Sequence, residues 1–220
     1  MDIASLIGPT LPADQPELRA VTATTLFGSF TRSGTSGALG NETDQALLLG
    51  VREWADCVLV GAGTIRAEGY GASATPTVVV SASLDLDTSS PLFEGTVAVA
   101  TPSHSLLDAS LAPRRDALRA VGARLLSTGS GSAPEIVEAA RHLGYSRISC
   151  EGGPSLYSGL LAADLVDVLH LTIDPSLSAA DGPAGLRFDS DSAAVRRFAL
   201  EAAEVGPDSM LFCRYRRARP

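Results

Sequence analysis

Short apolar runs rich in β-branched residues alternate with amphipathic stretches along most of the chain. The apolar runs predict strands, because their length and composition suit a buried sheet. The amphipathic stretches predict helices, because their apolar residues recur at helical spacing. The predicted strands are residues 18–27, 56–60, 77–81, 96–100, 124–127, 147–150 and 166–174, and the predicted helices are a segment capped by Asn41 that runs to about Ala55, then 114–121, 134–143 and 155–161.

The order of these elements predicts an α/β fold. Strands that alternate with helices favour a largely parallel sheet covered on both faces. Residues 199–205 and 210–215, joined by Gly206 and Pro207, have no helix between them and predict an antiparallel pair at the edge. Before them, a loop rich in serine, aspartate and glycine is predicted to run through Asp191.

The length and composition of the chain indicate one domain. Of its 220 residues 45% are hydrophobic, which is enough for one large core. The first 17 residues contain Pro9, Pro12 and Pro16 and are predicted as an irregular lead-in to a single domain over residues 18–220. No internal repeat is present.

Charge and cysteine content narrow the class of protein. The formal net charge is −8 and no helix carries a basic stripe, which argues against nucleic acid as a partner. No apolar run approaches membrane-spanning length, and the acids and prolines at the N-terminus do not suit a signal peptide. Cys57, Cys150 and Cys213 lie singly in apolar runs, as buried cysteines do in a reducing compartment. We therefore expect a soluble, cytoplasmic protein.

The most informative stretch is RISCEGGPSLYSGLL, residues 147–161. A strand is followed by Glu151, two glycines and a helix that begins near Pro154. Glycines let a ligand approach the backbone, and the amides at a helix N-terminus attract an anion. The same strand–glycine–helix order recurs at Gly61 to Thr64. The pattern predicts a phosphate-binding site, although a plain tight turn with one glycine is the simpler alternative.

Histidines give no sign of a metal site. His104, His142 and His170 are scattered, and no carboxylate lies at ligand spacing from them. His170 lies on an apolar strand, so we expect a core or interface histidine with its hydrogen bonds satisfied. No metal is predicted.

Two segments together carry a resemblance to a known family. ADCVLVGAGTIRAEGYG and ISCEGGPSLYSGLLAADLVDVLHLTIDP resemble the reductase domain of the riboflavin-pathway bifunctional deaminase/reductase, the RibD C-terminal domain family, and its stand-alone pyrimidine reductase-like members. The resemblance covers roughly residues 20–215. It implies a dihydrofolate-reductase-like three-layer sandwich with a mostly parallel sheet, NADPH as cofactor, and hydride transfer to the ribosyl group of a phosphoribosylamino-pyrimidine. It also implies a homodimer.

The resemblance assigns residues to two ligands. Ser36, Arg52 and Glu151 correspond to substrate contacts, with Arg52 toward a phosphate and Glu151 toward pyrimidine N–H groups. No catalytic residue is assigned. The cofactor contacts that it implies are Ala23, Gly61, Thr64, Glu68, Gly152, Gly153, Pro154, Ser155, Leu156, Tyr157, Ser158 and Gly159.

The chain departs from the family pattern at two places. Phe27 stands where the family has the aspartate of Ser-x-Asp-Gly, and at such a strand end we expect it to face the cleft and to slow turnover. The chain reads Glu68-Gly69-Tyr70-Gly71-Ala72, with no arginine, where the family often has Asp-Asp-Pro-x-Leu-x-x-Arg. Reduction of another pterin, folate or pyrimidine, and nucleotide binding with little or no turnover, therefore stay open as alternatives, as does NADH in place of NADPH.

Overall fold

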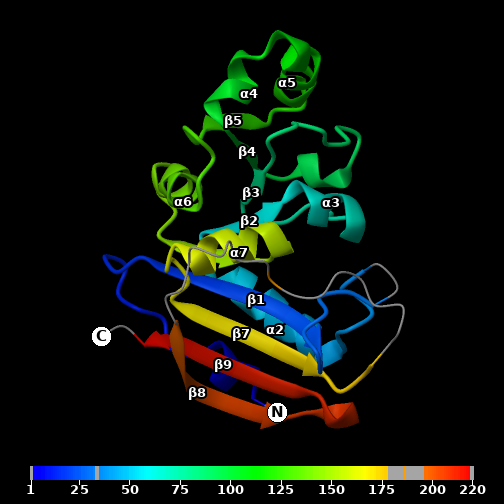
Figure 1. Cartoon of the computed structure of the whole chain (residues 1–220), viewed down its shortest axis with the longest axis vertical. Helices are drawn as coiled ribbons and strands as arrows, with labels where there is room; N and C mark the ends of the chain where they lie inside the picture. Colours follow the sequence, from blue (N-terminus) through cyan, green and yellow to red (C-terminus); the bar gives the residue numbers. More distant parts are fainter. Residues whose placement is uncertain (1, 33–34, 178–185, 187–195, 219–220) are drawn as a thin grey trace.

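Nine strands form one sheet at the centre of the molecule (Figure 1). The computed structural model describes residues 2–32, 35–177, 186 and 196–218. Within this part the strand order is β5-β4-β3-β2-β6-β1-β7-β9-β8. The strands are β1 (Glu17–Thr25), β2 (Cys57–Gly61), β3 (Thr77–Val80), β4 (Val97–Thr101), β5 (Arg124–Ser127), β6 (Arg147–Cys150), β7 (Val168–Asp174), β8 (Arg197–Val205) and β9 (Leu211–Ala218).

The pairing pattern confirms the predicted fold class. All neighbours from β5 to β7 pair in parallel, whereas β9 pairs antiparallel with both β7 and β8. Strand β6 lies between β1 and β2, so the chain returns late to fill the centre of the sheet. In open α/β sheets, a crevice forms beyond the carboxyl ends of strands where such a change of order occurs.

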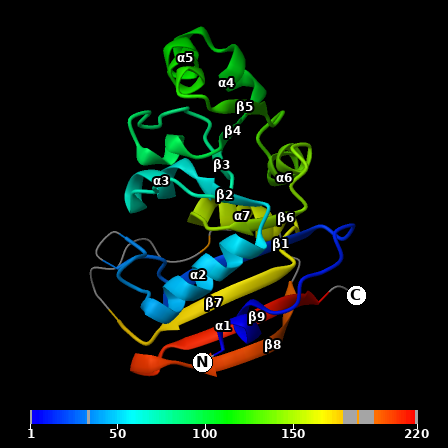
Figure 2. The same ribbon diagram turned by 180° about the vertical axis from the view of Figure 1, so that it is seen from behind.

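Helices cover both faces of the sheet (Figures 1 and 2). Helices α6 and α7 pack on one face over a core that includes Leu18, Ile148 and Leu160. On the other face α1 and α2 cover the β1–β9 half, while α3 and α5 pack against β2, β3 and β4. The helices are α1 (Ile3–Ile7), α2 (Glu42–Trp54), α3 (Ala62–Glu68), α4 (Ser103–Leu107), α5 (Ala112–Ala120), α6 (Ala133–Arg141) and α7 (Pro154–Ala162), with 3-10 turns η1 (Pro91–Glu94), η2 (Ala109–Leu111) and η3 (Pro207–Ser209).

The N-terminal segment is more ordered than its prolines suggested. It contains helix α1, capped by the Asp2 side chain, and Leu6 is buried in the core beneath α2. A Cβ placed on Gly50 of α2 would lie 2.3 Å from Cδ1 of Ile7, so the glycine inside α2 lets the side chain of Ile7 pack closely against the helix. The prediction of an irregular lead-in is therefore wrong for Ile3–Ile7, because α1 docks on the sheet, and for Glu17, which already begins β1.

Two arginines hold the end of α1 against the sheet. Arg19 is fully buried and donates to the carbonyl oxygens of Ile7 and Pro9, each over 2.7 Å. Arg214, on β9, donates to the carbonyl oxygens of Ser5 and Leu6. Because the last carbonyls of a helix lack partners within the helix, these guanidinium groups satisfy them and offset the negative end of the helix dipole.

His170 lies beside these arginines on β7 and is 1% exposed. Neither ring nitrogen has a hydrogen-bond partner in the described part of the chain. His170 is therefore buried in the core, as expected. The expectation that its hydrogen bonds are satisfied was wrong, since the described residues packed around the imidazole offer it no acceptor or donor.

The first strand ends two residues earlier than predicted. Strand β1 stops at Thr25, whose carbonyl accepts from the Gly28 amide over 3.0 Å in a tight turn. Gly28 has φ +79°, a conformation that glycine adopts without strain. The loop predicted from β7 to Asp191 lies largely outside the described residues.

Candidate active site

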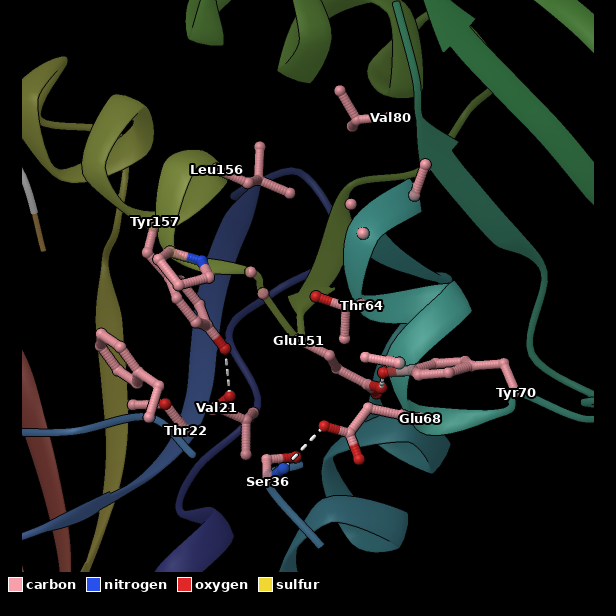
Figure 3. Close-up of a pocket in the computed structure, with 18 of the residues that line it drawn as sticks. Val21, Thr22, Ser36, Thr64, Glu68, Tyr70, Val80, Glu151, Leu156 and Tyr157 are labelled. Atoms are coloured by element: carbon pink, nitrogen blue, oxygen red, sulfur yellow. Dashed lines mark hydrogen bonds between the residues drawn. The ribbon is translucent and has the colours of Figure 1, made fainter. Parts of the chain in front are cut away.

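A cavity of about 1280 Å³ lies beyond the carboxyl ends of β1, β2, β3 and β6 (Figure 3). Its walls come from α2, α3, α7, the loop after β1 and the segment after β3. Most of the predicted ligand contacts line it: Ala23, Ser36, Arg52, Gly61, Thr64, Glu68, Glu151, Gly152, Gly153, Pro154, Ser155, Leu156, Tyr157 and Gly159. Ser158 is the exception, because it is 8% exposed and lies outside the lining.

Gly152 and Gly153 form a tight corner where β6 meets α7. The Gly61 amide donates to the Gly152 carbonyl over 2.7 Å, which brings the two glycine-rich turns together. A Cβ on Gly153 would lie 2.8 Å from Oγ1 of Thr64, and a Cβ on Gly152 would lie 3.1 Å from the Tyr157 ring. Gly152 also has φ +106°, and the peptide bond between the two glycines is cis. Packing within the protein therefore already requires both glycines, whether or not a ligand approaches them.

The N-terminus of α7 opens on the cavity without a side-chain cap. Its N-cap residue is Gly153, and the exposed Ser155 lies in its first turn. Helix α6 differs, because Ser132 and Glu135 form a capping box at its start. The free amides and the positive dipole end of α7 make this the wall of the cavity that favours an anion.

Arg52 on α2 and Glu151 at the end of β6 form a bidentate ion pair in the cavity wall. Arg52 Nε donates to Oε1 over 2.7 Å and Nη2 donates to Oε2 over 2.6 Å. The Tyr70 hydroxyl also donates to Oε2, over 2.8 Å. The Glu151 side chain is 3% exposed and that of Arg52 is 23% exposed. The hydrogen bonds to Glu151 raise the pKa of Arg52, and burial raises the pKa of Tyr70.

This cluster changes the meaning of two predicted residues. Glu151 holds the guanidinium of Arg52, so these two residues, both predicted as substrate contacts, bind each other in the structure. A guanidinium has five N–H donors, so the ion pair does not exhaust Arg52 as a donor toward a ligand. Tyr70 comes from the stretch where the family pattern has a further arginine, and it orients the carboxylate instead.

Glu68 and Ser36 join opposite walls of the cavity. The Ser36 amide donates to Oε1 of Glu68 over 2.7 Å, as Figure 3 shows. Glu68 was predicted as a cofactor contact and Ser36 as a substrate contact, and the structure links them directly. The hydrogen bond holds the loop after β1 against α3.

Tyr157 fixes the corner on its other side. Its hydroxyl donates to the Val21 carbonyl on β1 (Figure 3). Its ring centroid lies 5.9 Å from that of Phe30. Burial raises its pKa well above the ordinary value, so this phenol remains a hydrogen-bond donor. Tyr157 therefore ties α7 to the central strand.

Phe27 does not face the cavity. It is 80% exposed at the tip of the turn after β1 and lies outside the lining. The prediction that Phe27 faces the same cleft edge as Glu151 was wrong, because the strand ends at Thr25 and the turn directs this position to solvent.

Asp44 is a cavity residue that sequence reasoning did not select. It lies in the first turn of α2, where an acid is favourable for the helix dipole alone. In the structure it lines the cavity, and the Thr172 hydroxyl is its side-chain hydrogen-bond partner. Burial raises its pKa. The spacing of Asp44, Leu48 and Arg52 on one helix face was the available signal.

Other classes of site find no support in the described residues. These residues contain no group of three or more histidine, cysteine, aspartate or glutamate side chains that could hold a metal ion. No helix among them is long and apolar enough to cross a membrane.

Comparison with known proteins identifies the family. The family model of the RibD C-terminal domain matches residues 16–192. The chain belongs to the RibD C-terminal domain family. No match was found among curated proteins.

Solved structures agree with membership of the RibD C-terminal domain family. A pyrimidine reductase-like protein from Corynebacterium diphtheriae shares 30% identity with a TM-score of 0.87, over 100% of both chains. A riboflavin biosynthesis reductase from Saccharomyces cerevisiae shares 15% identity with a TM-score of 0.66, over 98% of this chain and 96% of the other. Dihydrofolate reductase from Enterococcus faecalis, solved with NADP(H), shares 16% identity with a TM-score of 0.54, over 93% and 98%. The dihydrofolate-reductase-like fold predicted from the sequence is confirmed.

Proposed function

We propose that the chain is an NADPH-dependent reductase that transfers a hydride to the ribosyl group of a phosphoribosylamino-pyrimidine, as in riboflavin biosynthesis. One observation carries this proposal. A single cavity contains both the uncapped N-terminus of α7 and the guanidinium of Arg52, which suit two anionic ligand groups. Family membership agrees with a reductase.

The glycine corner and α7 fit a dinucleotide cofactor. Gly61 and Gly153 line the cavity with backbone alone, and a Cβ on Gly63, which also lines the cavity, would meet nothing within 4 Å. Amides at the start of α7 would hold the pyrophosphate, together with Thr64 and Ser155. When bound, the nicotinamide supplies the hydride, and the protein contributes binding, orientation and exclusion of water.

The opposite wall fits the substrate. Arg52 would donate to the phosphate, and Glu151 and Tyr70 would keep the guanidinium in one orientation. Ser36, held by Glu68, would place the loop after β1 over the bound substrate. Glu151 thus acts mainly by positioning Arg52, and the two residues function as a unit.

A second candidate follows from the same ion pair. Glu151 already neutralises Arg52, and Tyr70 stands in the stretch where the family pattern has another arginine. In this cavity Arg52 is neutralised and the family's further arginine is absent. It therefore favours a pyrimidine or pterin without a phosphate more than a cavity with the family's arginines would. Reduction of such a ring is therefore the second candidate function. A nucleotide-binding role without turnover rested mainly on Phe27 in the cleft, and it loses this support because Phe27 lies outside the cavity.

We also propose a homodimer in the cytoplasm. Strand β8 is the edge strand, and Leu200 and Val205 on it are 56% and 75% exposed. No described helix covers the face of β7, β9 and β8 opposite α1 and α2 (Figure 1). Apolar residues at an open edge favour pairing with a second copy. The three cysteines are free and buried, which suits a reducing compartment.

The direct test is NADPH oxidation followed with a phosphoribosylamino-pyrimidine and with dihydrofolate side by side. Turnover of the first at a kcat/KM well above that of the second supports the proposal, and the reverse order supports the second candidate. Binding of NADPH without oxidation in the presence of either compound would contradict both.

A further inference from the structure

Arg19 is buried between the sheet and the C-terminal end of α2. On β1 it is the register partner of Ser149, which lies two residues before Glu151 on the neighbouring strand β6. On the side of α2, the Cζ atom of Arg19 lies 3.8 Å from the centroid of the Trp54 ring. Arg19 therefore touches the helix that carries Arg52 and borders the strand that leads to Glu151.

Hydrogen bonds fix the plane of the Arg19 guanidinium. Nε and Nη2 donate to Oε2 of Glu17 over 2.8 Å and 2.7 Å. Nη1 donates to the Ile7 carbonyl and Nη2 to the Pro9 carbonyl, each over 2.7 Å. The N–H groups of a guanidinium all lie in its plane, so these bonds occupy the edge of the group and leave its flat faces for stacking. The strand and the N-terminal segment thus hold Arg19 in place against Trp54.

Trp54, the last residue of α2, is oriented by this stacking contact. It is 7% exposed, and its indole N–H has no hydrogen-bond partner in the described part of the chain. Buried tryptophans usually use that N–H as a polar anchor. Because the anchor is absent here, the cation over the ring is the contact that favours one ring orientation over another. The contact is strong because both groups are removed from water.

The orientation of Trp54 bears on Arg52 because both residues belong to the last turn of α2. Two positions along an α-helix are about 200° apart around its axis, so Trp54 faces the core while Arg52 faces the cavity. A rotation of this turn moves Arg52 relative to Glu151, which follows a strand and does not move with the helix. A bidentate pair needs the guanidinium and the carboxylate in one plane, so it responds to a small rotation.

Arg214 provides a comparison on the neighbouring part of the sheet. Like Arg19 it donates to carbonyl oxygens of α1, those of Ser5 and Leu6, and it pairs with Glu201. Unlike Arg19 it lies over no aromatic ring of the described residues. Two arginines therefore share the anchoring of α1, whereas the stacking contact with the end of α2 is made by Arg19.

We propose that Arg19 is a positioning residue, which acts through Trp54 to set the orientation of Arg52 and thereby the affinity of the cavity for a substrate phosphate. The effect on Arg52 follows from the packing alone. The effect on the substrate rests on the proposed reductase function. Arg19 itself touches no ligand, because it is fully buried and lies outside the cavity lining.

The first test follows the ion pair by NMR on the full chain without any ligand. The Nε–H of Arg52 donates to Glu151, so its proton should exchange slowly with water, and its resonance is assigned by its loss in Arg52→Lys. Arg19→Met removes the flat cation and should speed this exchange roughly tenfold, the factor for a weakened hydrogen bond between charged groups. Arg214→Met removes the other anchor of α1 and should leave the exchange within about twofold of native.

Substitutions at Trp54 test the same link and leave the buried charges in place. Trp54→Leu removes the ring and should speed the exchange of the Arg52 Nε–H as Arg19→Met does. Trp54→Phe keeps a flat ring for the guanidinium and should retain the native exchange rate. The Trp54 variants therefore decide the matter even where Arg19→Met folds poorly.

The second test measures kinetics with NADPH and a phosphoribosylamino-pyrimidine. Arg19→Met should raise KM for this substrate roughly fivefold to tenfold, a part of the loss expected when Arg52 itself is removed, with NADPH affinity unchanged. KM does not depend on the fraction of protein that is folded, so a less stable variant still gives an answer. In an Arg52→Ala background, Arg19→Met should have no further effect on KM, because the residue through which it acts is gone. Arg214→Met should leave KM unchanged.

The outcomes separate the role of Arg19 from the proposed function. A native exchange rate of the Arg52 Nε–H in Trp54→Leu, or equal effects of Arg19→Met and Arg214→Met, would show that Arg19 only anchors α1. Faster exchange with a native KM, or a further rise of KM in the Arg52→Ala background, would overturn the link to the substrate phosphate. Absence of NADPH oxidation by the native protein overturns the proposed function instead, and the exchange rates then decide the positioning of Arg52 by themselves.

Discussion

Arg52 and Glu151 are 99 positions apart in the sequence and meet in a bidentate ion pair, with hydrogen bonds of 2.7 Å and 2.6 Å. The pair joins α2 to the end of β6 at the wall of the cavity. Since Glu151 is buried, the pair has consequences for stability as well as for ligand binding.

Removal of Arg52 should therefore have two effects. Arg52→Ala leaves a buried carboxylate without its cation and should lower the free energy of unfolding by about 3 kcal/mol. It should also raise KM for a phosphorylated substrate about tenfold or more, with NADPH affinity nearly unchanged. Denaturant unfolding and steady-state kinetics measure the two effects.

A matched control is available on the same strand. Arg147 pairs with Asp56 at the other end of β6, outside the cavity lining. Arg147→Ala should cost some stability and leave KM unchanged. Equal losses of substrate and cofactor affinity in Arg52→Ala would instead make Arg52 a purely structural residue.

Gly153 should be intolerant of even a methyl group. A Cβ there would lie 2.8 Å from Oγ1 of Thr64, so Gly153→Ala should destabilise the corner and weaken NADPH binding, and Gly153→Val should abolish it. Melting temperature with and without NADPH reports both properties.

A double variant separates packing from ligand approach. Gly153→Ala with Thr64→Ala relieves the clash and should recover the melting temperature of the protein alone. If NADPH affinity then returns to that of Thr64→Ala, Gly153 serves packing only and does not border the cofactor.

The hydrogen bond between Glu68 and the Ser36 amide should control the loop after β1. Glu68→Ala removes the acceptor and should weaken the loop's attachment by about 1 kcal/mol. Faster hydrogen exchange or proteolysis within residues 29–40 would show this. Glu68→Gln keeps an acceptor oxygen and should be milder, and Glu94→Ala, an exposed acid elsewhere, should leave the loop unaffected.

His170 should make the protein sensitive to acid. Burial, and then the charges of Arg19, Arg214 and Arg216, lower the pKa of His170 to about 3 from its ordinary value of 6.5. The folded state therefore keeps the imidazole neutral while the unfolded chain takes up a proton. This contribution to stability is complete above pH 6.5 and is lost as the pH falls toward 3, by at most about 1.4 kcal/mol per pH unit.

Unfolding measured at several pH values tests this. His170→Leu should show a shallower loss of stability between pH 6.5 and pH 4 than the native protein. His142→Leu, at an exposed position, should keep the native slope. Parallel curves for the native protein and His170→Leu would rule out His170 as the source of the acid sensitivity.

Phe27→Asp should leave kcat within about twofold of the native value, since exposed surface substitutions away from a site have small effects. Phe27 is 80% exposed and lies outside the cavity lining. A large rise in kcat measured with the same substrate would show that the turn closes over the site during the reaction.

The sequence predicted the sheet well because its apolar runs are short, regular and separated by clear turn signals. It placed the antiparallel edge correctly, since the few residues from Gly206 to Met210 leave room only for the short 3-10 turn η3 between the last two strands. It missed α1, because the prolines nearby suggested irregular chain and because one of the arginines that hold α1, Arg214, lies 208 positions away from Leu6 on β9.

The sequence predicted which residues line the cavity, but it did not predict which of them contact one another. The resemblance brought Arg52, Glu151, Glu68 and Ser36 to one place, but spacing alone does not reveal that they pair with one another. Asp44 was missed because an acid in the first turn of a helix already has an ordinary explanation. Phe27 was misjudged because the exact end of a strand depends on the turn that follows it.

The hydrogen bonds from Arg214 to α1 determine when α1 can complete its packing as the chain is synthesised. Arg214 donates to the carbonyl of Ser5 across 209 positions, so α1 is synthesised long before the strand that supplies its partner. During translation α1 can pack against α2, but the side of its core cluster formed by Phe212 on β9 is completed only when β9 has been made. Removing α1 or β9 should therefore reduce the yield of soluble product more than it disturbs the chemistry of the cavity.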